Sequence, residues 1–182
     1  MNRKRFTVLL CAALLLCCVC QSALAYISVT TKKLVNVMEP VTVDVLLEEV
    51  FDPDEAEDIS VGQEIEKQPR LQNTGILNEY LAMKVEYVSN GSTSGTDLRT
   101  QWITLLNVDT VNWVLAAQQD DYAIYYYRDA VEPEGYTSYL FDGVRVSSNW
   151  TNSCDFDIVL TGAAIQAEGV EMSSTIAAEL FE

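Results

Sequence analysis

The sequence contains no histidine, and after residue 25 it contains a single cysteine, Cys154. Without histidine the chain has no Ser-His-Asp or Cys-His catalytic set and no histidine-containing zinc site. A single cysteine forms no intramolecular disulfide, which separates this chain from small extracellular domains built on disulfide frameworks. Because Cys154 alternates with Phe156 and Ile158, we expect a buried structural thiol; an exposed thiol would instead allow an intermolecular disulfide.

Basic residues are also scarce. Three of the eleven precede residue 26, so residues 26–182 carry 8 Lys and Arg against 27 Asp and Glu, a net charge of −19. Such a chain repels nucleic acid and anionic membrane surfaces, and neither is an expected partner. Its length suffices to bury the core of one domain, which we place at residues 26–182.

The first 25 residues have the pattern of a secretory signal peptide. Basic residues at positions 3–5 precede a fifteen-residue run, 6–20, that is apolar except for one threonine. The run is short for a membrane span, which needs roughly 20 apolar residues. Small residues suited to a signal peptidase follow at Ala23, Leu24 and Ala25. We expect cleavage there and no stable membrane insertion afterwards, with an uncleaved signal anchor as the alternative.

Acidic residues form groups that resemble carboxylate sites, but their number makes solvated surface the first interpretation. Segment 51–58 is predicted to be an exposed, hydrated loop; its five acids, at 52–58, lack the glycine and glutamate spacing of a calcium loop, and calcium binding is left open. Three pairs have the residue types of a glycosidase acid and base: Asp120/Asp121, Glu132/Glu134 and Asp155/Asp157. We assign no catalytic residue, no metal site and no cofactor.

Alternating apolar residues predict several short strands. The clearest are residues 41–47 and 81–87, and a more polar strand over 59–71 is limited by Pro69. Residues 73–75 give a turn, and 111–117 and 155–165 give further strands. Many short strands separated by turns favour a two-sheet antiparallel sandwich.

Two helices and a tyrosine-rich pair of strands complete the prediction. Apolar residues recur at helical spacing over 97–108, with Thr96 or Asp97 as the expected cap. A short C-terminal helix is expected over 174–180. Segment 121–146 holds six of the nine tyrosines, and its two strand-like runs flank a connector with proline and glycine. Aromatic residues on both sides of its first run predict a strand covered on two faces.

The expected mature N-terminus is prone to β structure. It could be an ordinary edge strand of its own sandwich, or a strand that pairs with the open edge of a neighbouring subunit. The candidate donor strand consists of Tyr26, Ile27, Ser28, Val29, Thr30 and Thr31.

The order of these segments resembles the TasA/camelysin family of secreted proteins from Gram-positive bacteria. The stretch ALAYISVTTKKLVNVMEPVTVDVLLEE is similar to that family's cleavage site, polar link and first strand. QNTG followed by YLAMKVEY is similar to its turn and next strand. NWVLAAQQDDYAIYYYRDAVEPEGYTSYLFDGVRV is similar to its aromatic hairpin region, and FDIVLTGAAIQAEGVE to its closing strand.

The resemblance implies a mostly β, jelly-roll type antiparallel sandwich with one or two short helices, exported to the cell surface or the extracellular matrix. It also implies a biofilm-matrix or cell-surface fibre in which subunits join by N-terminal strand donation. The partners would then be further copies or related matrix proteins, and signal peptidase during export. A monomeric module that binds carbohydrate or host protein is one alternative, and a camelysin-like secreted peptidase is another, which the absence of histidine disfavours.

Overall fold

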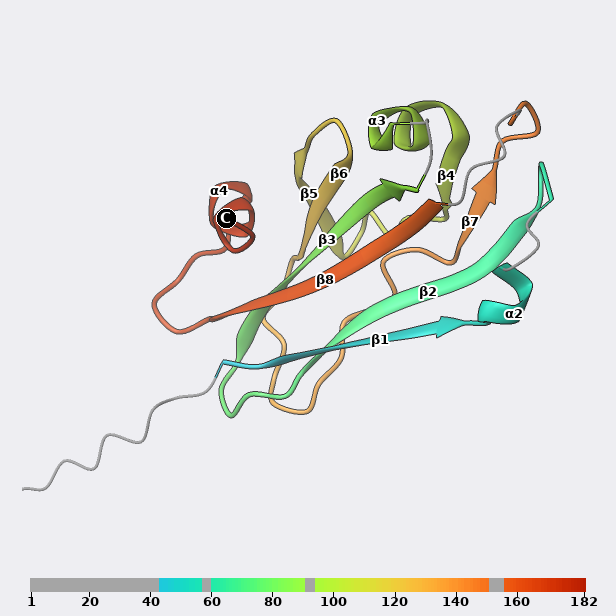
Figure 1. Cartoon of the computed structure of the whole chain (residues 1–182). Coiled ribbons are helices and arrows are strands. Elements are labelled where there is room, and N and C mark those ends of the chain that lie inside the picture. The colour runs from blue at the N-terminus through green and yellow to red at the C-terminus, as the bar shows by residue number, and fades with distance from the viewer. Residues whose placement is uncertain (1–42, 57–59, 91–93, 151–155) are drawn as a thin grey trace, which may run out of the picture. The chain divides into compact units, whose positions relative to one another are not determined.

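The computed structural model describes residues 43–56, 60–90, 94–150 and 156–182. The chain divides into two units, residues 1–39 and 40–182, and all described residues belong to the second. The described strands of that unit form two four-stranded antiparallel sheets, and its helical segments have at most six residues (Figure 1). The predicted antiparallel β-sandwich is confirmed, and its jelly-roll type stays a prediction.

In chain order the strands are β1 (Val45–Phe51), β2 (Glu64–Asn73), β3 (Glu79–Ser89), β4 (Ile103–Leu106), β5 (Trp113–Gln118), β6 (Tyr122–Tyr127), β7 (Gly143–Val146) and β8 (Phe156–Gln166). The helical segments are α2 (Pro53–Ala56), α3 (Gly95–Asp97), the π-helical turn η1 (Leu98–Trp102) and α4 (Ser174–Glu179).

The first sheet has the strand order β1-β2-β7-β4, and the second has the order β5-β6-β3-β8. β1 pairs with β2 from Val45↔Asn73 to Phe51↔Lys67, and β3 pairs with β8 along its whole length. Only the β1–β2 and β5–β6 connections stay within one sheet; the other connections between consecutive strands cross from one sheet to the other. Strands that are consecutive in the sequence therefore often lie in different sheets. The core lies between the two sheets, which several connections link.

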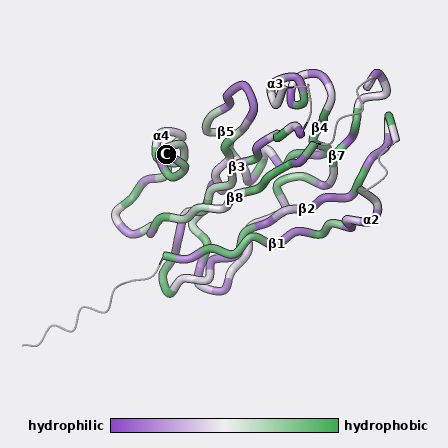
Figure 2. Tube along the Cα trace, viewed as in Figure 1, coloured by the Kyte–Doolittle hydropathy of each residue, from purple (hydrophilic) through white to green (hydrophobic). Residues whose placement is uncertain are grey.

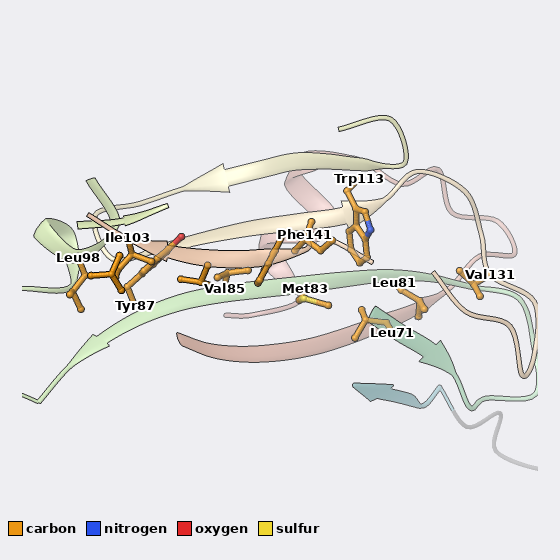
Figure 3. Packing of buried hydrophobic residues seen from close by; sticks show 13 residues of the cluster. Leu71, Leu81, Met83, Val85, Tyr87, Leu98, Ile103, Trp113, Val131 and Phe141 are labelled. Atoms are coloured by element: carbon orange, nitrogen blue, oxygen red, sulfur yellow. The ribbon is translucent and has the colours of Figure 1, made fainter. Parts of the chain in front are cut away.

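The core forms where the alternating side chains of the two sheets face each other. Leu81, Met83 and Val85 of β3 are fully buried, as predicted from their alternation. They pack with Leu71 of β2 and with Phe141 before β7, and the cluster continues along the sandwich (Figure 3). Hydropathy along the trace follows this arrangement, because hydrophobic residues prevail on β3 and β8 whereas β2 is mainly hydrophilic (Figure 2). β2 contributes its apolar residues to the core and its polar ones to the outer face.

A second, smaller cluster covers the outer face of the second sheet. Ala177 of α4 is buried with Ala82 of β3 and Ile124 of β6. Ser173 caps α4, and its side chain accepts from the N–H of Ile176. The predicted C-terminal helix is confirmed. β6 is an interior strand with α4 on one face and the core on the other. This confirms the prediction that the first tyrosine-rich strand is covered on both faces.

The predicted helix over residues 97–108 is wrong. α3 and η1 give a few helical residues, capped by Ser94 rather than Thr96 or Asp97, and the chain then enters β4. Ile103 of β4 pairs with Val146 of β7, more than forty residues later. This distant pairing outweighs the local helical spacing, which reflects only where Leu98 and Trp102 meet the core.

Three further predictions need correction. The tyrosine-rich hairpin of residues 121–146 does not form, because β6 pairs with β5 and β3 whereas β7 belongs to the other sheet. Pro69 does not limit β2, which continues to Asn73; its carbonyl accepts from the N–H of Leu140 at 2.9 Å. β1 also extends through Phe51, into the segment predicted as a loop.

Candidate functional site

Two of the four edge strands are poorly suited to pairing with another chain. β4 has four residues, and β5 has a register shift between Leu115 and Ala117. Short edges and bulges are devices by which sheets avoid edge pairing. β1 and β8 run for seven and eleven residues, and their pairings have no register shift. Among the described strands, the long and regular sheet edges are therefore those of β1 and β8.

The backbone of β8 offers regularly spaced groups at its outer edge. The N–H of Tyr87 donates to Asp121 on the β6 side of β3, so odd-numbered β3 residues face β6 and even-numbered ones face β8. The β8 partners of these even-numbered residues are odd-numbered. The N–H and C=O groups of Phe156, Ile158 and Leu160 consequently point away from β3, toward an edge that no strand in the described part of the chain occupies.

An apolar groove lies between these two edges. Its volume is about 510 Å³, and it runs between β1, β2 and β7 of one sheet and β8 of the other. We call it the edge groove. Its lining residues are Glu49, Phe51, Pro53, Ile65, Lys67, Val144, Phe156, Asp157, Ile158 and Val159. The groove thus joins an apolar cleft to a strand edge with free hydrogen-bonding groups.

Farther along β8, at Gly162, the two sheets of the sandwich pack directly against each other. A Cβ atom on Gly162 of β8 would lie 2.8 Å from Leu71 Cδ2 and 3.7 Å from Val45 Cγ1. Glycine therefore allows the two sheets to touch at this point, and they separate toward the end of β1 and the start of β8 (Figure 1). The edge groove is a consequence of this separation.

An ion pair forms part of the groove lining. Lys67 points into the sandwich, only 8% exposed, and its Nζ lies 2.7 Å from Glu49 Oε2 and 4.4 Å from the centre of the Phe51 ring. Such a pair adds little net stability, but any segment that covers it must leave both charged groups paired or hydrogen-bonded. A strand entering the groove would therefore have to place apolar side chains beside Ile65 and Ile158 while leaving this pair satisfied.

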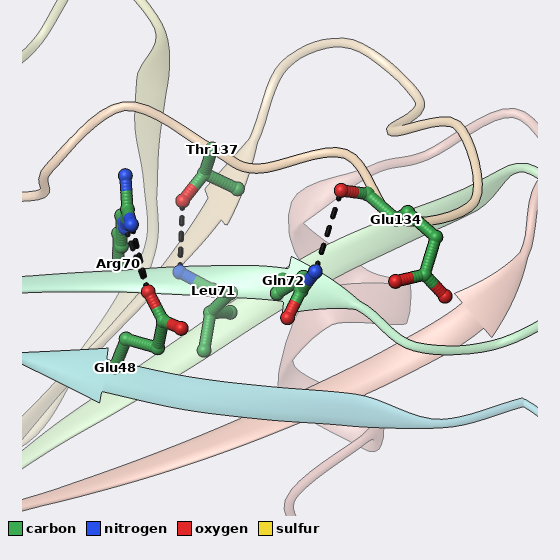
Figure 4. Close-up of polar contacts among 6 residues, drawn as sticks. All are labelled: Glu48, Arg70, Leu71, Gln72, Glu134 and Thr137. Atoms are coloured by element: carbon green, nitrogen blue, oxygen red, sulfur yellow. Dashed lines mark hydrogen bonds and ion pairs between the residues drawn. The ribbon is translucent and has the colours of Figure 1, made fainter.

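β2 is fixed on both sides, so the groove wall does not depend on β1 alone. Arg70 Nη2 lies 2.8 Å from Glu48 Oε2 of β1. On the opposite edge the N–H of Leu71 donates to Thr137 Oγ1, and Gln72 donates to the carbonyl of Glu134 (Figure 4). Segment 131–142 thereby continues the line of β7 beside β2.

The aromatic residues pack against one another. Trp113 is 2% exposed and meets the Tyr127 ring edge-on at 5.3 Å. Trp102 and Trp150 are half-buried and make a similar contact at 5.5 Å, and Trp150 also contacts Phe156 beside the groove. Tyr136 is the exposed aromatic in the described part, and it stacks on Arg70. The tryptophans and the β6 tyrosines do not form a continuous exposed patch.

Several residues singled out from the sequence lie outside the described ranges. These are the candidate donor strand, residues 26–31, the cleavage region, residues 23–25, and Cys154. Of the acidic segment 52–58, residues 52–56 are described, and Asp52 accepts from the N–H of Asp54 at the start of α2. Within the described ranges, no three Asp, Glu or Cys side chains come close enough to hold a metal ion.

The groove residues were not identified by sequence reasoning. Lys67 carried a signal, because a charged residue stands between Ile65 and Leu71 at positions of the same strand face. Gly162 gave another, as a glycine in the middle of a predicted strand. The groove itself depends on β1, β2 and β8 meeting, which no local pattern contains.

Comparisons of the chain with protein families, with curated proteins and with solved structures give no match. Within the described ranges, no helix is long and apolar enough to cross a membrane.

Proposed function

We propose that this protein is a secreted structural subunit of a cell-surface or extracellular-matrix fibre. In this proposal residues 26–31 of one copy add as a strand to the open edge of β8 in the next copy. The apolar side chains of that strand enter the edge groove, and its backbone pairs with the groups that β8 leaves free. The role is structural rather than catalytic, and it agrees with the resemblance to the TasA/camelysin family.

The observation that carries the proposal is the edge groove itself. Natural sheets usually protect a long, regular edge with charge, proline, a bulge or a covering element. β8 has eleven residues and one charged side chain, Asp157, and its edge borders a cleft lined by Phe156, Ile158 and Val159. A strand seated there would extend the second sheet and cover these side chains.

The charge distribution favours pairing between the N-terminal segment and the sandwich. Residues 40–182 contain 6 Lys and Arg against 26 Asp and Glu, a net charge of −20. Residues 26–38 contain Lys32 and Lys33 and no acid, a net charge of +2. Two sandwiches repel each other, whereas this segment is the part of the mature chain that another sandwich attracts.

The first test removes the proposed donor. The chain of residues 26–182 and a variant without residues 26–33 are incubated at equal concentration and followed by sedimentation and electron microscopy. We expect the longer chain to form fibres and the shorter one to stay a folded monomer by size-exclusion chromatography and circular dichroism. A synthetic peptide of residues 26–37 should then bind the shorter chain, and a scrambled peptide should not. Fibres formed by the shorter chain would exclude strand donation.

The second test changes the acceptor. Val159→Lys places a cation on the groove lining at a side chain that is 42% exposed, so the fold should tolerate it. Val111→Lys makes the same change in the β4–β5 connection, where Val111 is 75% exposed, and serves as the matched control. We expect the first variant to weaken peptide binding and assembly at least tenfold and the second to have little effect. Equal loss in both would point to general charge effects and against this groove.

A further inference from the structure

Glu79 is the buried charged group that the proposed function does not use. It opens β3, and its backbone is fixed by hydrogen bonds with Val131, with N···O distances of 3.0 and 2.8 Å. Its side chain is 0% exposed, and neither carboxylate oxygen has a hydrogen-bond partner in the described part of the chain. A buried carboxylate in this state is unfavourable unless it is neutralised.

No described cation compensates Glu79. Lys67, Arg70, Lys84 and Arg145 form ion pairs with Glu49, Glu48, Glu86 and Glu64, respectively. Arg99 and Arg128 donate to the carbonyls of Asp120 and Val111. These six are all the basic residues of 40–182, so the sandwich supplies no counter-charge of its own.

The groups around Glu79 do not compensate for its burial. Asp44, just before β1, is the charged residue that faces it and acts in two opposite ways: its main-chain N–H favours the ionised carboxylate, and its negative charge, the smaller effect, opposes ionisation. The neighbours on the paired strand and bridge are Gln166 of β8 and Val131, which carry no charge. Asn73 of β2, also fully buried, directs its amide to the carbonyls of Leu77 and Val131. Burial is the main cause that raises the pKa of Glu79 above its usual 4.5.

We propose that Glu79 is a proton-binding group built into the fold, neutral while residues 43–45 are docked beside the start of β3. Ionisation at rising pH would draw the carboxylate toward water and loosen residues 43–45. The bond from the Thr74 N–H to the Asp44 carbonyl, 3.0 Å long, lies at this contact and would open first. This property concerns the soluble monomer and does not depend on strand donation.

The test compares wild-type residues 26–182 with Glu79→Gln, which keeps the shape of the neutral acid. A group whose folded-state pKa is raised contributes stability below its unfolded pKa and loses it as pH rises through the folded value. The unfolding equilibrium constant of wild type, divided by that of Glu79→Gln, should therefore increase with pH above about 4.5, by up to about tenfold per unit. Hydrogen exchange at Thr74, compared between the two proteins at each pH, should accelerate in wild type over the same range.

Two variants separate this effect from general charge repulsion. Glu86→Gln, on the same strand but paired with Lys84, should leave the ratio to wild type far less dependent on pH. Asp44→Asn removes the neighbouring negative charge and so lowers the folded-state pKa of Glu79; the rise should still begin near pH 4.5 but end at a lower pH and be smaller. As the pH is raised above about 4.5, infrared spectra of wild type should keep a carboxylic-acid C=O band that Glu79→Gln lacks. A ratio that does not change with pH, or a Glu79→Gln variant equally destabilised at every pH, would overturn the proposal.

Discussion

At the scale of single residues, Asp109 shows how one carboxylate joins two crossing connections. It accepts from the backbone N–H groups of Val111 and Asn112, from Asn112 Nδ2 at 2.7 Å and from Ser138 Oγ at 2.6 Å. The Ser138 hydroxyl contributes most, followed by Asn112, and together they lower the pKa of Asp109 from 3.8 to about 2. The β4–β5 connection is thereby tied to the β6–β7 connection.

Replacing Asp109 with Asn should lower the free energy of unfolding by about 1 kcal/mol at neutral pH, after allowance for solvent screening. A carboxyl group with a depressed folded-state pKa contributes stability above its unfolded pKa and loses it as pH falls through the folded value. The difference between wild type and Asp109→Asn should thus be constant above about pH 4 and shrink toward pH 2. Denaturant unfolding across this range measures it, with Asp129→Asn, at an exposed position, as the control. An undiminished difference at pH 2 would contradict the assignment.

At the scale of elements, two of the three ion pairs that join β2 to its neighbours should differ sharply in their contribution to stability. Lys67 is buried against Glu49, whereas the Arg145 and Glu64 side chains between β7 and β2 are 49% and 54% exposed. Glu49→Gln should cost about 2 kcal/mol because it leaves a buried ammonium without its counter-charge. Glu64→Gln should cost less than about 0.5 kcal/mol, since exposed pairs contribute little.

The double variant Glu49→Leu/Lys67→Met completes this test of the β1–β2 pair. If the pair imposes specificity more than stability, two apolar side chains should recover most of the loss, measured by denaturant unfolding. A double variant less stable than Glu49→Gln would show that the pair itself stabilises the sheet.

The elements also show which parts of the fold can be predicted from sequence. In β3 and in the first half of β8, every second residue is apolar and packs on the core, so local periodicity was sufficient to place these strands. β4 and β7 have four residues each and pair with each other although they are distant in sequence. Local patterns do not contain this pairing, so they led to a wrong helix over 97–108 and a wrong hairpin over 121–146. The edge groove has the same origin, because its walls come from strands that are distant in sequence.

At the scale of the whole molecule, net charge should control assembly. Sandwiches of −20 repel one another, and lowering the pH from 7 to 5 neutralises part of that charge. We expect residues 26–182 to assemble at a lower concentration at pH 5, and also when divalent ions are added, as measured by sedimentation. Glu79→Gln should respond in nearly the same way, because this effect belongs to the many exposed carboxylates rather than to one buried group.

The dependence of assembly on salt can separate the two electrostatic contributions. Salt screens both the repulsion between sandwiches and the attraction of the +2 segment, with a Debye length of about 10 Å at 0.1 M. Because the repulsion acts between two sandwiches that each carry a charge of −20, it should be stronger than the attraction of the +2 segment. Screening by NaCl should therefore promote assembly. Lys32→Gln/Lys33→Gln removes the attraction alone, so this variant should need more salt than wild type to assemble. If NaCl instead dissolves wild-type fibres and leaves the lysine variant unaffected, attraction by the N-terminal segment, rather than repulsion between sandwiches, governs assembly.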